Sequence, residues 1–414
     1  MARELRKLKT LEEARQILQE ALPPRLREGR FPGRPTPIAE ALGLVLAEEV
    51  RSPEDLPPFD RSLRDGYAVR AEDTFGASEG MPAYLEVVGE VRMGAAPQLS
   101  LGRNQCARIP TGGMLPEGAD AVVMVEYTQP WGEGSVEVLR PAAPGAYIVR
   151  RGDDVREGEV VLPAGHQLRA RDLSALAGLG IGEVSVMRPR VAVLSTGDEV
   201  VHHTASPTAG QIRDMNGPAL RAAAQSLGAE AIDLGIVGDD PEALRAALRR
   251  GVEEADVVLA SGGTSVGAED LMPGIIDSLG APGVIVHGLA LKPGKPAAIG
   301  LVGETPVFGL PGNPTSCLII FRELVAPMLR GARGPAERPA PRRARLARNV
   351  ASTAGREEFL PVRLEERAGA TYAVPLLGPS ALISMLVRAD GLVRIPAEAE
   401  GLHAEAEVEV EPVE

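Results

Sequence analysis

The sequence predicts a multidomain protein of the α/β plus β class, and three observations support this prediction. The chain has 414 residues, which corresponds to about two to four domains. Strand-like and helix-like segments alternate between residues 190 and 330, a pattern typical of a parallel α/β sheet. Short strand-like runs broken by turns fill much of residues 60–140 and the region after 345, which indicates two further β-rich parts.

The N-terminal region is expected to form helices. Residues 10–22, TLEEARQILQEAL, have an amphipathic pattern with Thr10 as the N-cap and Glu13 as its capping-box partner. Residues 38–50, IAEALGLVLAEEV, are predicted to form a second helix. The proline-rich SPEDLPPFDRS that follows indicates a boundary near 52–60.

A β-rich module is expected next. Its clearest predicted strands are PAYLEVVGEVRM, ADAVVMVEY and SVEVLR, and WGEG at 131–134 is typical of a hairpin. After this module, RARDLSALAGLG is predicted to form a short helix that ends at Gly180.

The region 190–330 predicts the α/β domain. VAVLSTGDE, AIDLGIVGDD and DVVLASGGTSVG each begin as a strand and end in a turn. Helices are expected in ALRAAAQSLGA, in PEALRAALRRGVEEA with Asp240 as N-cap and Pro241 as first residue, and in TSCLIIFRELVAPMLRG. Ligands of such sheets bind beyond the carboxyl ends of the strands. The clusters that follow strand-like runs are therefore expected to form one site: TGDE, GDD, SGGTSVG, KPGKP and LPGNP.

The last part of the chain is predicted to be a small β domain. Residues 331–345, GARGPAERPAPRRAR, have the composition of a linker. The strands predicted after it are EFLPVRLEE, TYAVPLL, GLVRIPA and AEVEVEPV.

Composition excludes several classes of function. The formal net charge of −13 argues against a nucleic-acid surface. Two cysteines fit a reducing compartment, and the five histidines show no zinc-site spacing. The sequence has no run of about 20 apolar residues and no apolar signal core near its start, so we expect a cytoplasmic protein with no membrane partner.

The lysines are distributed unusually. Only four of the 44 basic residues are lysine, and two of these, Lys292 and Lys295, occur together in LKPGKP. A basic position that is merely solvated would more commonly be arginine in this chain. Lysine is a compact point charge with three donors, and the two prolines stiffen the loop, so the pair indicates an oxyanion site.

The stretch SGGTSVGAED after DVVLA is compatible with a phosphate cradle. Glycines let backbone N–H groups approach an anion, and hydroxyl groups and a following helix N-terminus add donors. A flexible connecting loop is the alternative, because the stretch has neither a Walker A pattern nor a dinucleotide fingerprint. The candidate binding residues are Ser261, Gly262, Gly263, Thr264, Ser265, Gly267 and Asp270.

Carboxylates after the other strands are candidates for a divalent cation or ribose hydroxyls. Glu199 belongs to TGDEV, and Asp239 and Asp240 belong to VGDDP. Asp240 is explained as a helix N-cap, so Asp239 is the preferred functional residue.

Turn chemistry alone explains Asp65 before Gly66, and Thr111 lies in a segment with loop composition.

Taken together, these motifs resemble one family. In the same order, the chain carries FDRSLRDGYAV, IPTGGMLPEGADAVVMVE, RRGDDVREGEVVLPAGHQL, STGDE, SGGTSVGAED, LKPGKPAAIG and FGLPGNPTS. Over essentially its whole length the chain is similar to the MoeA family of molybdopterin molybdenumtransferases, whose unit also occurs as the E domain of gephyrin. Two departures are Arg61, where the family has asparagine, and Pro379 within GPSALISM, where the family has glycine and serine.

The resemblance implies a fold of four domains and a homodimer in which each active site uses both protomers. The expected parts are a helical/extended domain of residues 1–52 and 144–188, an inserted β-rich domain of residues 53–143, a MogA-like α/β molybdopterin-binding domain of residues 189–333, and a C-terminal β-barrel domain of residues 334–414.

The resemblance also implies a reaction: insertion of molybdate into the dithiolene of adenylylated molybdopterin, with release of AMP and assistance from Mg²⁺. Tungstate is an alternative oxyanion, and a MogA-type adenylyltransferase is an expected protein partner. Two alternative functions are an adenylyltransferase that activates molybdopterin and a non-catalytic scaffold of cofactor assembly.

Roles for residues follow from the matched motifs. The residues implied in catalysis are Asp65, Thr111, Glu199, Asp239, Asp270, Lys292 and Lys295, with the first two reaching in from the partner's β-rich domain. The glycine-rich loop and Asp270 are expected to hold the pterin nucleotide, and Glu199 and Asp239 to bind magnesium. The residues implied around molybdate are Lys295, Pro296, Ser316, Arg356 and Ser380.

Overall fold

The computed structural model describes residues 8–263, 271–333, 340–367 and 369–413. Its contacts divide the chain into two compact units. The first comprises Met1–Glu48, Gly165–Arg169 and Val184–Glu414, and the second comprises Glu49–Ala164 and Ala170–Glu183. No helix in the described ranges combines the length and the apolar composition needed to cross a membrane.

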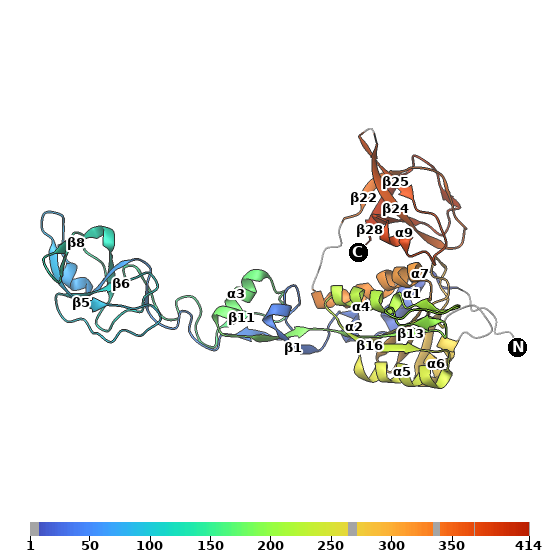
Figure 1. Ribbon diagram of the computed structural model, residues 1–414, viewed down its shortest axis with the longest axis horizontal. Coiled ribbons are helices and arrows are strands. Elements are labelled where there is room, and N and C mark those ends of the chain that lie inside the picture. Colours follow the sequence, from blue (N-terminus) through green and yellow to red (C-terminus); the bar gives the residue numbers. More distant parts are fainter. Residues whose placement is uncertain (1–7, 264–270, 334–339, 368, 414) are drawn as a thin grey trace. The chain divides into compact units, whose positions relative to one another are not determined.

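A six-stranded mixed sheet forms the centre of the first unit (Figure 1). Across the sheet, its strands are β16 (Glu230–Val237), β13 (Arg190–Thr196), β17 (Val257–Ser261), β21 (Thr305–Leu310), β20 (Ala298–Val302) and β18 (Pro282–His287). The first four are parallel, as predicted. The fifth, β20, is antiparallel to both of its neighbours, β21 and β18, which was not predicted from the sequence. The two-residue turn Gly303–Glu304 joins β20 to β21, and so short a connection joins only antiparallel strands.

Helices cover both faces of this sheet. Val191 and Val193 of β13 share one core with Leu220, whereas Ala192 and Leu194 belong to a second core on the opposite face. Figure 1 shows α5 and α6 on one side of the sheet and α1 and α4 on the other. The helices are α1 (Leu11–Ala21), α4 (Asn216–Ser226), α5 (Pro241–Glu254), α6 (Leu271–Leu279) and α7 (Pro314–Ile320). Burial on both faces explains the continuous apolar runs of the strands.

The predicted helix starts are confirmed. Thr10 caps α1 and forms a capping box with Glu13. Asp240 caps α5 by accepting the N–H of Ala243 at 2.7 Å, and Pro241 is the first helical residue.

The last predicted helix of the α/β region has an irregular middle. After α7, a π-helical turn η4 (Phe321–Val325) leads into α8 (Ala326–Leu329) and a 3-10 turn η5 (Arg330–Arg333). Pro327 lacks the N–H that would bond to the carbonyl of Glu323, so regular α-helical bonding cannot continue through this segment.

The predicted C-terminal β-barrel is confirmed. Its strands are β22 (Arg342–Leu346), β24 (Glu357–Arg367), β25 (Ala370–Pro375), β26 (Gly391–Ile395) and β28 (Glu407–Pro412). β24 pairs with both β25 and β26, which closes a five-stranded barrel around an apolar core. The short β19 (Leu291–Lys292) pairs in parallel with the start of β24 and thereby ties the barrel to the α/β domain.

The helix predicted at residues 38–50 is wrong. Only η1 (Ile38–Glu40) is helical there. The N–H groups of Gly43 and Leu46 donate to Leu168 and His166, and that of Ala47 donates to Ser185. These long-range backbone bonds replace the i→i−4 bonds of a helix, and Gly43 takes a positive φ of 77°. Tertiary pairing therefore overrides the local helical propensity.

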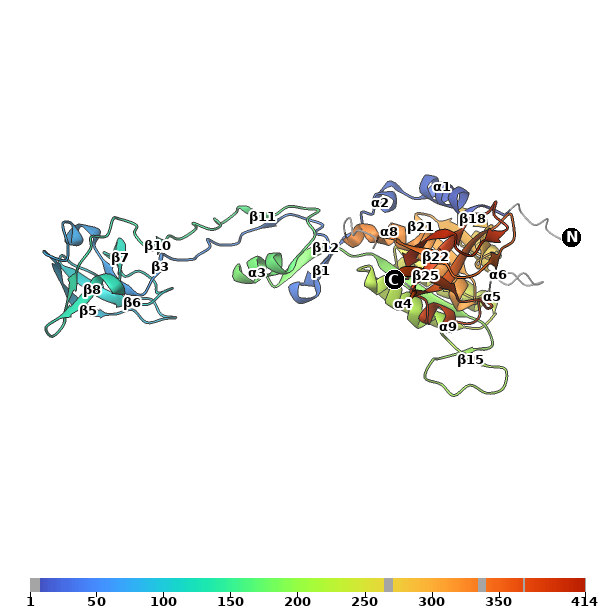
Figure 2. The ribbon, with the colours of Figure 1, turned by 90° about the horizontal axis from the view of Figure 1, so that it is seen from above.

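Several short elements complete the first unit. They are α2 (Pro24–Arg27), the pair β1 (Gly33–Pro37) and β12 (Glu183–Met187), the pair β14 (Val200–Val201) and β15 (Ile212–Arg213), the pair β23 (Val350–Ala351) and β27 (Gly401–Leu402), and α9 (Ser384–Val387). Figure 2 shows the chain that carries β15 extending away from the sheet as a long loop.

The second unit contains the predicted β-rich module. Across its six-stranded sheet the strands are β7 (Ala121–Met124), β4 (Gly66–Val69), β6 (Gln105–Ile109), β5 (Ala83–Glu90), β9 (Ser135–Val138) and β8 (Thr128–Trp131). β8 and β9 meet at the predicted hairpin. The rest of this unit includes η2 (Ala71–Thr74), η3 (Val125–Tyr127), the predicted α3 (Ala170–Gly178), and the pairs β2 (Val50–Arg51) with β11 (Val160–Leu162) and β3 (Arg61–Ser62) with β10 (Ile148–Val149).

Candidate functional site

The larger of two adjoining cavities lies at the carboxyl edge of the α/β sheet and has a volume of about 570 Å³. It is lined by Thr196 at the end of β13, by Ser261 at the end of β17, and by Gly312 and Asn313 after β21. The chain leaves β13 toward β16 on one side and later returns to β17 on the other. The cavity therefore lies at the topological switch point, where open α/β sheets bind ligands.

Predicted site residues line this larger cavity. Those in the described part of the chain are Glu199, Asp239, Ser261, Gly262, Gly263 and Pro296. Four further residues predicted in the glycine-rich loop lie outside the described residues: Thr264, Ser265, Gly267 and Asp270.

Gly262 shows why the loop needs glycine. Its φ is +103°, and a Cβ there would lie 2.4 Å from the carbonyl oxygen of Thr196. The N–H of Gly262 donates to the carbonyl of Leu310 at 3.0 Å. This amide therefore fixes the loop against β21 and is not one of the donors expected for a bound phosphate.

The two aspartates after β16 have different surroundings. The side chain of Asp240 caps α5, whereas Asp239 lines the larger cavity together with Glu199. The backbone N–H of Asp239 donates to Asp198 Oδ1 at 3.0 Å, which connects this turn to the one after β13. Within the described ranges, no cluster of three or more metal-ligating side chains occurs. Two carboxylates still fit Mg²⁺, which proteins commonly bind through one or two carboxylates and ligand phosphates.

Asp214 and Asn216 organise the same cavity and were not predicted from the sequence. Asp214 accepts hydrogen bonds from Ser195 Oγ and from the N–H of Gly217, both at 2.9 Å. Asn216 Nδ2 donates to Ser261 Oγ at 2.6 Å and to the carbonyl of Gly312 at 2.8 Å. The available signal was the polar stretch RDMN at the start of α4, because the unpaired N–H groups of a helix start favour polar side chains and ligands.

Unpaired polar atoms mark both cavities. Among the described residues, four buried side-chain N or O atoms lack a hydrogen-bond partner, and three of these belong to cavity-lining residues: Thr196, Asn216 and Thr315. Buried polar atoms are normally paired, so a ligand that supplies the missing partners fits this position.

The smaller cavity has a volume of about 330 Å³ and adjoins the larger one, with which it shares Pro296, Pro311 and Asn313. Its lining comes from the KPGKP loop, the start of α7 and the barrel. The residues predicted to contact anions all line it: Lys292, Lys295, Pro296, Ser316, Arg356 and Ser380.

The cationic groups of the smaller cavity differ in their pairing. Lys292 Nζ lies 3.0 Å from Glu358 Oε2, and Ser352 Oγ donates to the same oxygen at 2.5 Å. Lys295 and Arg356 have no ion-pair partner among the residues that the structure describes. Two uncompensated positive charges therefore face one small cavity.

Pro379 does not remove Ser380 from the smaller cavity. Both residues line it. Ser380 Oγ accepts a hydrogen bond from Asn313 Nδ2 at 3.0 Å, and its carbonyl accepts the N–H of Thr315 at 3.3 Å. The departure from the glycine and serine run is accommodated by these bonds to the start of α7.

Asp65 and Thr111 lie together in the second unit. The N–H of Thr111 donates to Asp65 Oδ1 at 2.8 Å, and both residues are exposed. Position 66 requires glycine, because an added Cβ there would lie 1.9 Å from the carbonyl oxygen of Val123. The hydrogen bond to Asp65 Oδ1 therefore holds exposed Asp65, just before β4, beside exposed Thr111, which follows β6.

The two cysteines are poor nucleophile candidates. Burial raises the pKa of the Cys317 thiol to about 12, although a hydrogen bond with Ser261 acts to lower this pKa. Burial likewise raises the pKa of Cys106 to about 12. Both thiols are neutral near pH 7, and the thiolate is the reactive form.

The fold and the two cavities together define a multidomain α/β protein with one cavity at the switch point of its sheet and an adjoining, smaller cavity lined by lysine and arginine. Three family models match the chain. They are described as "MoeA N-terminal region (domain I and II)" over residues 9–180, "Probable molybdopterin binding domain" over residues 192–331, and "MoeA C-terminal region (domain IV)" over residues 343–413. The chain belongs to the MoeA family.

Named relatives agree with this assignment. The chain is 37% identical over 382 residues to molybdopterin molybdenumtransferase 2 of Mycobacterium tuberculosis, covering 90% of this chain and 93% of the relative. It is 40% identical over 301 residues to molybdopterin molybdenumtransferase of Nostoc, covering 72% and 69%. The molybdopterin biosynthesis MoeA protein of Pyrococcus horikoshii has a similar solved structure, with a TM-score of 0.75, 41% identity, and coverage of 98% and 99%.

Proposed function

We propose that this protein is a molybdopterin molybdenumtransferase, which inserts molybdate into the dithiolene of adenylylated molybdopterin and releases AMP. The observation that carries this proposal is the pair of adjoining cavities with different chemistry. One is large and rich in hydrogen-bonding groups, and the other is small and cationic. The relatives named molybdopterin molybdenumtransferase support the same reaction.

In this proposal the larger cavity binds the pterin nucleotide. Thr196 and Asn216 offer buried polar atoms that lack partners among the described residues, and a pterin edge carries complementary donors and acceptors. A site that leaves buried polar groups unpaired without its ligand discriminates strongly against molecules that cannot pair them.

The smaller cavity binds molybdate. Lys295 and Arg356 supply positive charge, and Ser316 and Ser380 supply hydroxyl groups that can donate to oxyanion oxygens. Because the two cavities adjoin at Pro296, the oxyanion is held next to the reacting end of the pterin ligand.

Charge stabilisation is the main catalytic contribution of these side chains. Lys292 and Lys295 stabilise the negative charge that develops as the phosphate group of AMP leaves. Glu199 and Asp239 would hold Mg²⁺, which when bound offsets the charge of the substrate phosphate.

The proposal extends to the assembly and the domains. We infer a homodimer in which Asp65 and Thr111 of the partner complete each site, a cytoplasmic location, and a functional link to a MogA-type adenylyltransferase that supplies the substrate. The division into four domains at about residues 52, 143, 188 and 333 is part of the same proposal. Tungstate is an alternative substrate to molybdate, since both are doubly charged tetrahedral oxyanions.

The test of this proposal is Lys295→Ala. We expect turnover of adenylylated molybdopterin with molybdate to fall by about 10² or more, as when one charge-stabilising group is removed from an active site. The melting temperature should change by no more than about 2 °C, because Lys295 pairs with no described carboxylate. Lys9→Ala, at a lysine paired with Glu13 on α1, is the matched control and should keep its activity.

Unchanged turnover in Lys295→Ala would remove the smaller cavity from the reaction. Consumption of ATP with molybdopterin would favour the adenylyltransferase alternative. A protein that turns over neither substrate would favour the scaffold.

A further inference from the structure

The carboxylate of Glu358 lies within the smaller cavity, where an anionic ligand would be repelled by an unpaired carboxylate. Glu358 is 8% exposed and lines the cavity. β19 and β24 pair in parallel with Lys292 opposite Glu358, so the register places the two side chains together. The resulting ion pair of 3.0 Å is reinforced by Ser352, whose hydroxyl donates to the same carboxylate oxygen.

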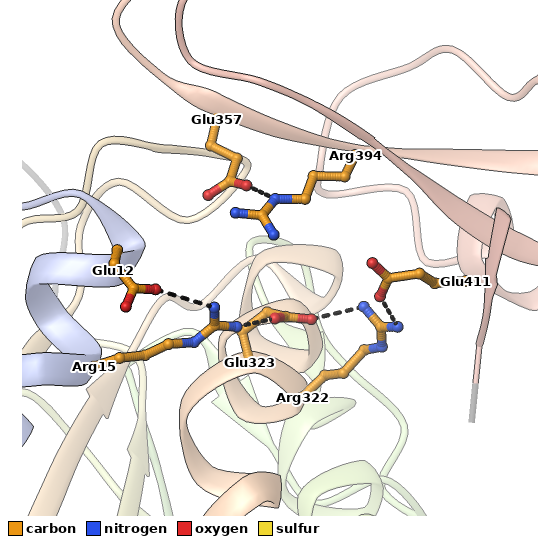
Figure 3. A network of polar contacts seen from close by, with 7 residues as sticks. All are labelled: Glu12, Arg15, Arg322, Glu323, Glu357, Arg394 and Glu411. Carbon is orange, nitrogen blue, oxygen red and sulfur yellow. Dashed lines mark hydrogen bonds and ion pairs between the residues drawn. The ribbon is translucent and has the colours of Figure 1, made fainter. Parts of the chain in front are cut away.

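The adjacent residue, Glu357, has a different partner. It is also buried, and it pairs with Arg394 on β26, as Figure 3 shows. Successive residues of a strand point to opposite faces, and Glu357 does not line the smaller cavity. Two neighbouring carboxylates on one strand therefore offer a matched pair for comparison.

Some of the charged side chains that line the smaller cavity are already paired with each other. In the described ranges the charged lining residues are Lys292, Lys295, Arg356 and Glu358, which leave a net charge of +2. The carboxylate of Glu358 is bound to Lys292, so among the residues that the structure describes the uncompensated cations are Lys295 and Arg356. Molybdate and tungstate each carry two negative charges, which equals the uncompensated charge.

We propose that Glu358 is a positioning residue that neutralises and fixes Lys292, so that the smaller cavity matches one doubly charged oxyanion. This inference rests on the proposed function, since it takes molybdate as the ligand of this cavity. It assigns Lys292 a second task besides its contact with substrate phosphate. Without Lys292, the carboxylate of Glu358 faces the oxyanion and weakens its binding.

The test measures molybdate binding by titration calorimetry in a double-mutant cycle. Lys292→Met should weaken binding by about tenfold or more, because an unpaired carboxylate then repels the oxyanion at short range. Lys292→Met/Glu358→Gln should bind within about threefold of the wild type, because the net charge is again +2. Glu358→Gln alone should bind at least as tightly as the wild type, with a steeper dependence on salt. Glu357→Gln should leave the affinity unchanged.

Two results would overturn the inference while leaving the proposed function intact. One is a double variant that binds as weakly as Lys292→Met, and the other is weaker binding by Glu358→Gln. If Lys292→Met does not fold, the double variant, which lacks the orphaned carboxylate, is compared directly with the wild type. A wild-type protein that binds no molybdate would contradict the oxyanion site itself, and this inference with it.

Discussion

The roles of single residues can be predicted from sequence when their partners are local, as a comparison of Asp240 with Glu358 shows. The cap at Asp240 is local, since its partner is three residues away, and the sequence predicted it. The pairing of Glu358 with Lys292 joins residues 66 positions apart, and no local pattern relates them. Asn216 was missed for the same reason, because its partners are Ser261 and Gly312.

Gly262→Ala tests the geometry of the glycine-rich loop. The added Cβ would meet the Thr196 carbonyl at 2.4 Å in a left-handed backbone conformation, so we expect a loss of roughly 1–3 kcal/mol of stability and a higher KM for the nucleotide substrate. Gly303→Ala is the control, because Gly303 also has a positive φ but nothing lies within 4 Å of its added Cβ. Thermal melts and steady-state kinetics compare the two, and equal effects would contradict the close approach at Gly262.

Helices and strands could be predicted from the sequence where the apolar pattern of a segment and its local propensity indicate the same element. The helix expected at 38–50 failed because Leu46 and its neighbours pair with distant backbone groups. The antiparallel pairing of β20 with β21 and β18 was missed, although the Gly303–Glu304 turn between two apolar runs was a hairpin signal.

A chain of ion pairs links three elements that the sequence does not relate (Figure 3). Glu323 of η4 is paired with Arg15 of α1 at 2.5 Å and with Arg322 at 2.7 Å. Arg322 in turn reaches Glu411 of β28 at 2.5 Å. The side chain of Glu323 is only 4% exposed. The ion pairs around this buried carboxylate therefore hold α1 and the barrel strand β28 against the irregular helix.

Glu323→Gln should therefore destabilise the protein by about 3 kcal/mol, because it leaves two arginine charges beside a neutral buried group. Glu12→Gln removes an exposed partner of the same Arg15, and we expect an effect below about 0.5 kcal/mol. Denaturant titration monitored by circular dichroism measures both. Indistinguishable midpoints for the two variants would show that the buried network does not hold these elements together.

At the scale of the whole molecule, the order of seven motifs sufficed to recognise the family from sequence, because each motif is a short local pattern. The matched family models extend over residues 9–180, 192–331 and 343–413. The two cavities could not be derived from these motifs alone. Their walls combine the sheet, the KPGKP loop and the barrel, which are brought together only by tertiary packing.

The proposed composite site predicts complementation between two inactive variants. Asp65→Asn and Lys295→Ala should each be inactive as homodimers. A heterodimer of the two should have about half of the wild-type activity, because one of its two sites then receives an intact Asp65 and an intact Lys295. Coexpression with two affinity tags isolates the heterodimer. An inactive heterodimer would place Asp65 and Lys295 of the same protomer in one site.

We propose above all that the two adjoining cavities join molybdate to adenylylated molybdopterin. The most direct test of this proposal supplies the purified protein with adenylylated molybdopterin and Mg²⁺ and measures AMP release with and without molybdate. We expect AMP release that depends on molybdate and that falls by about 10² or more in Lys295→Ala. AMP release at the same rate without molybdate, or none in its presence, would rule out this reaction at the two cavities.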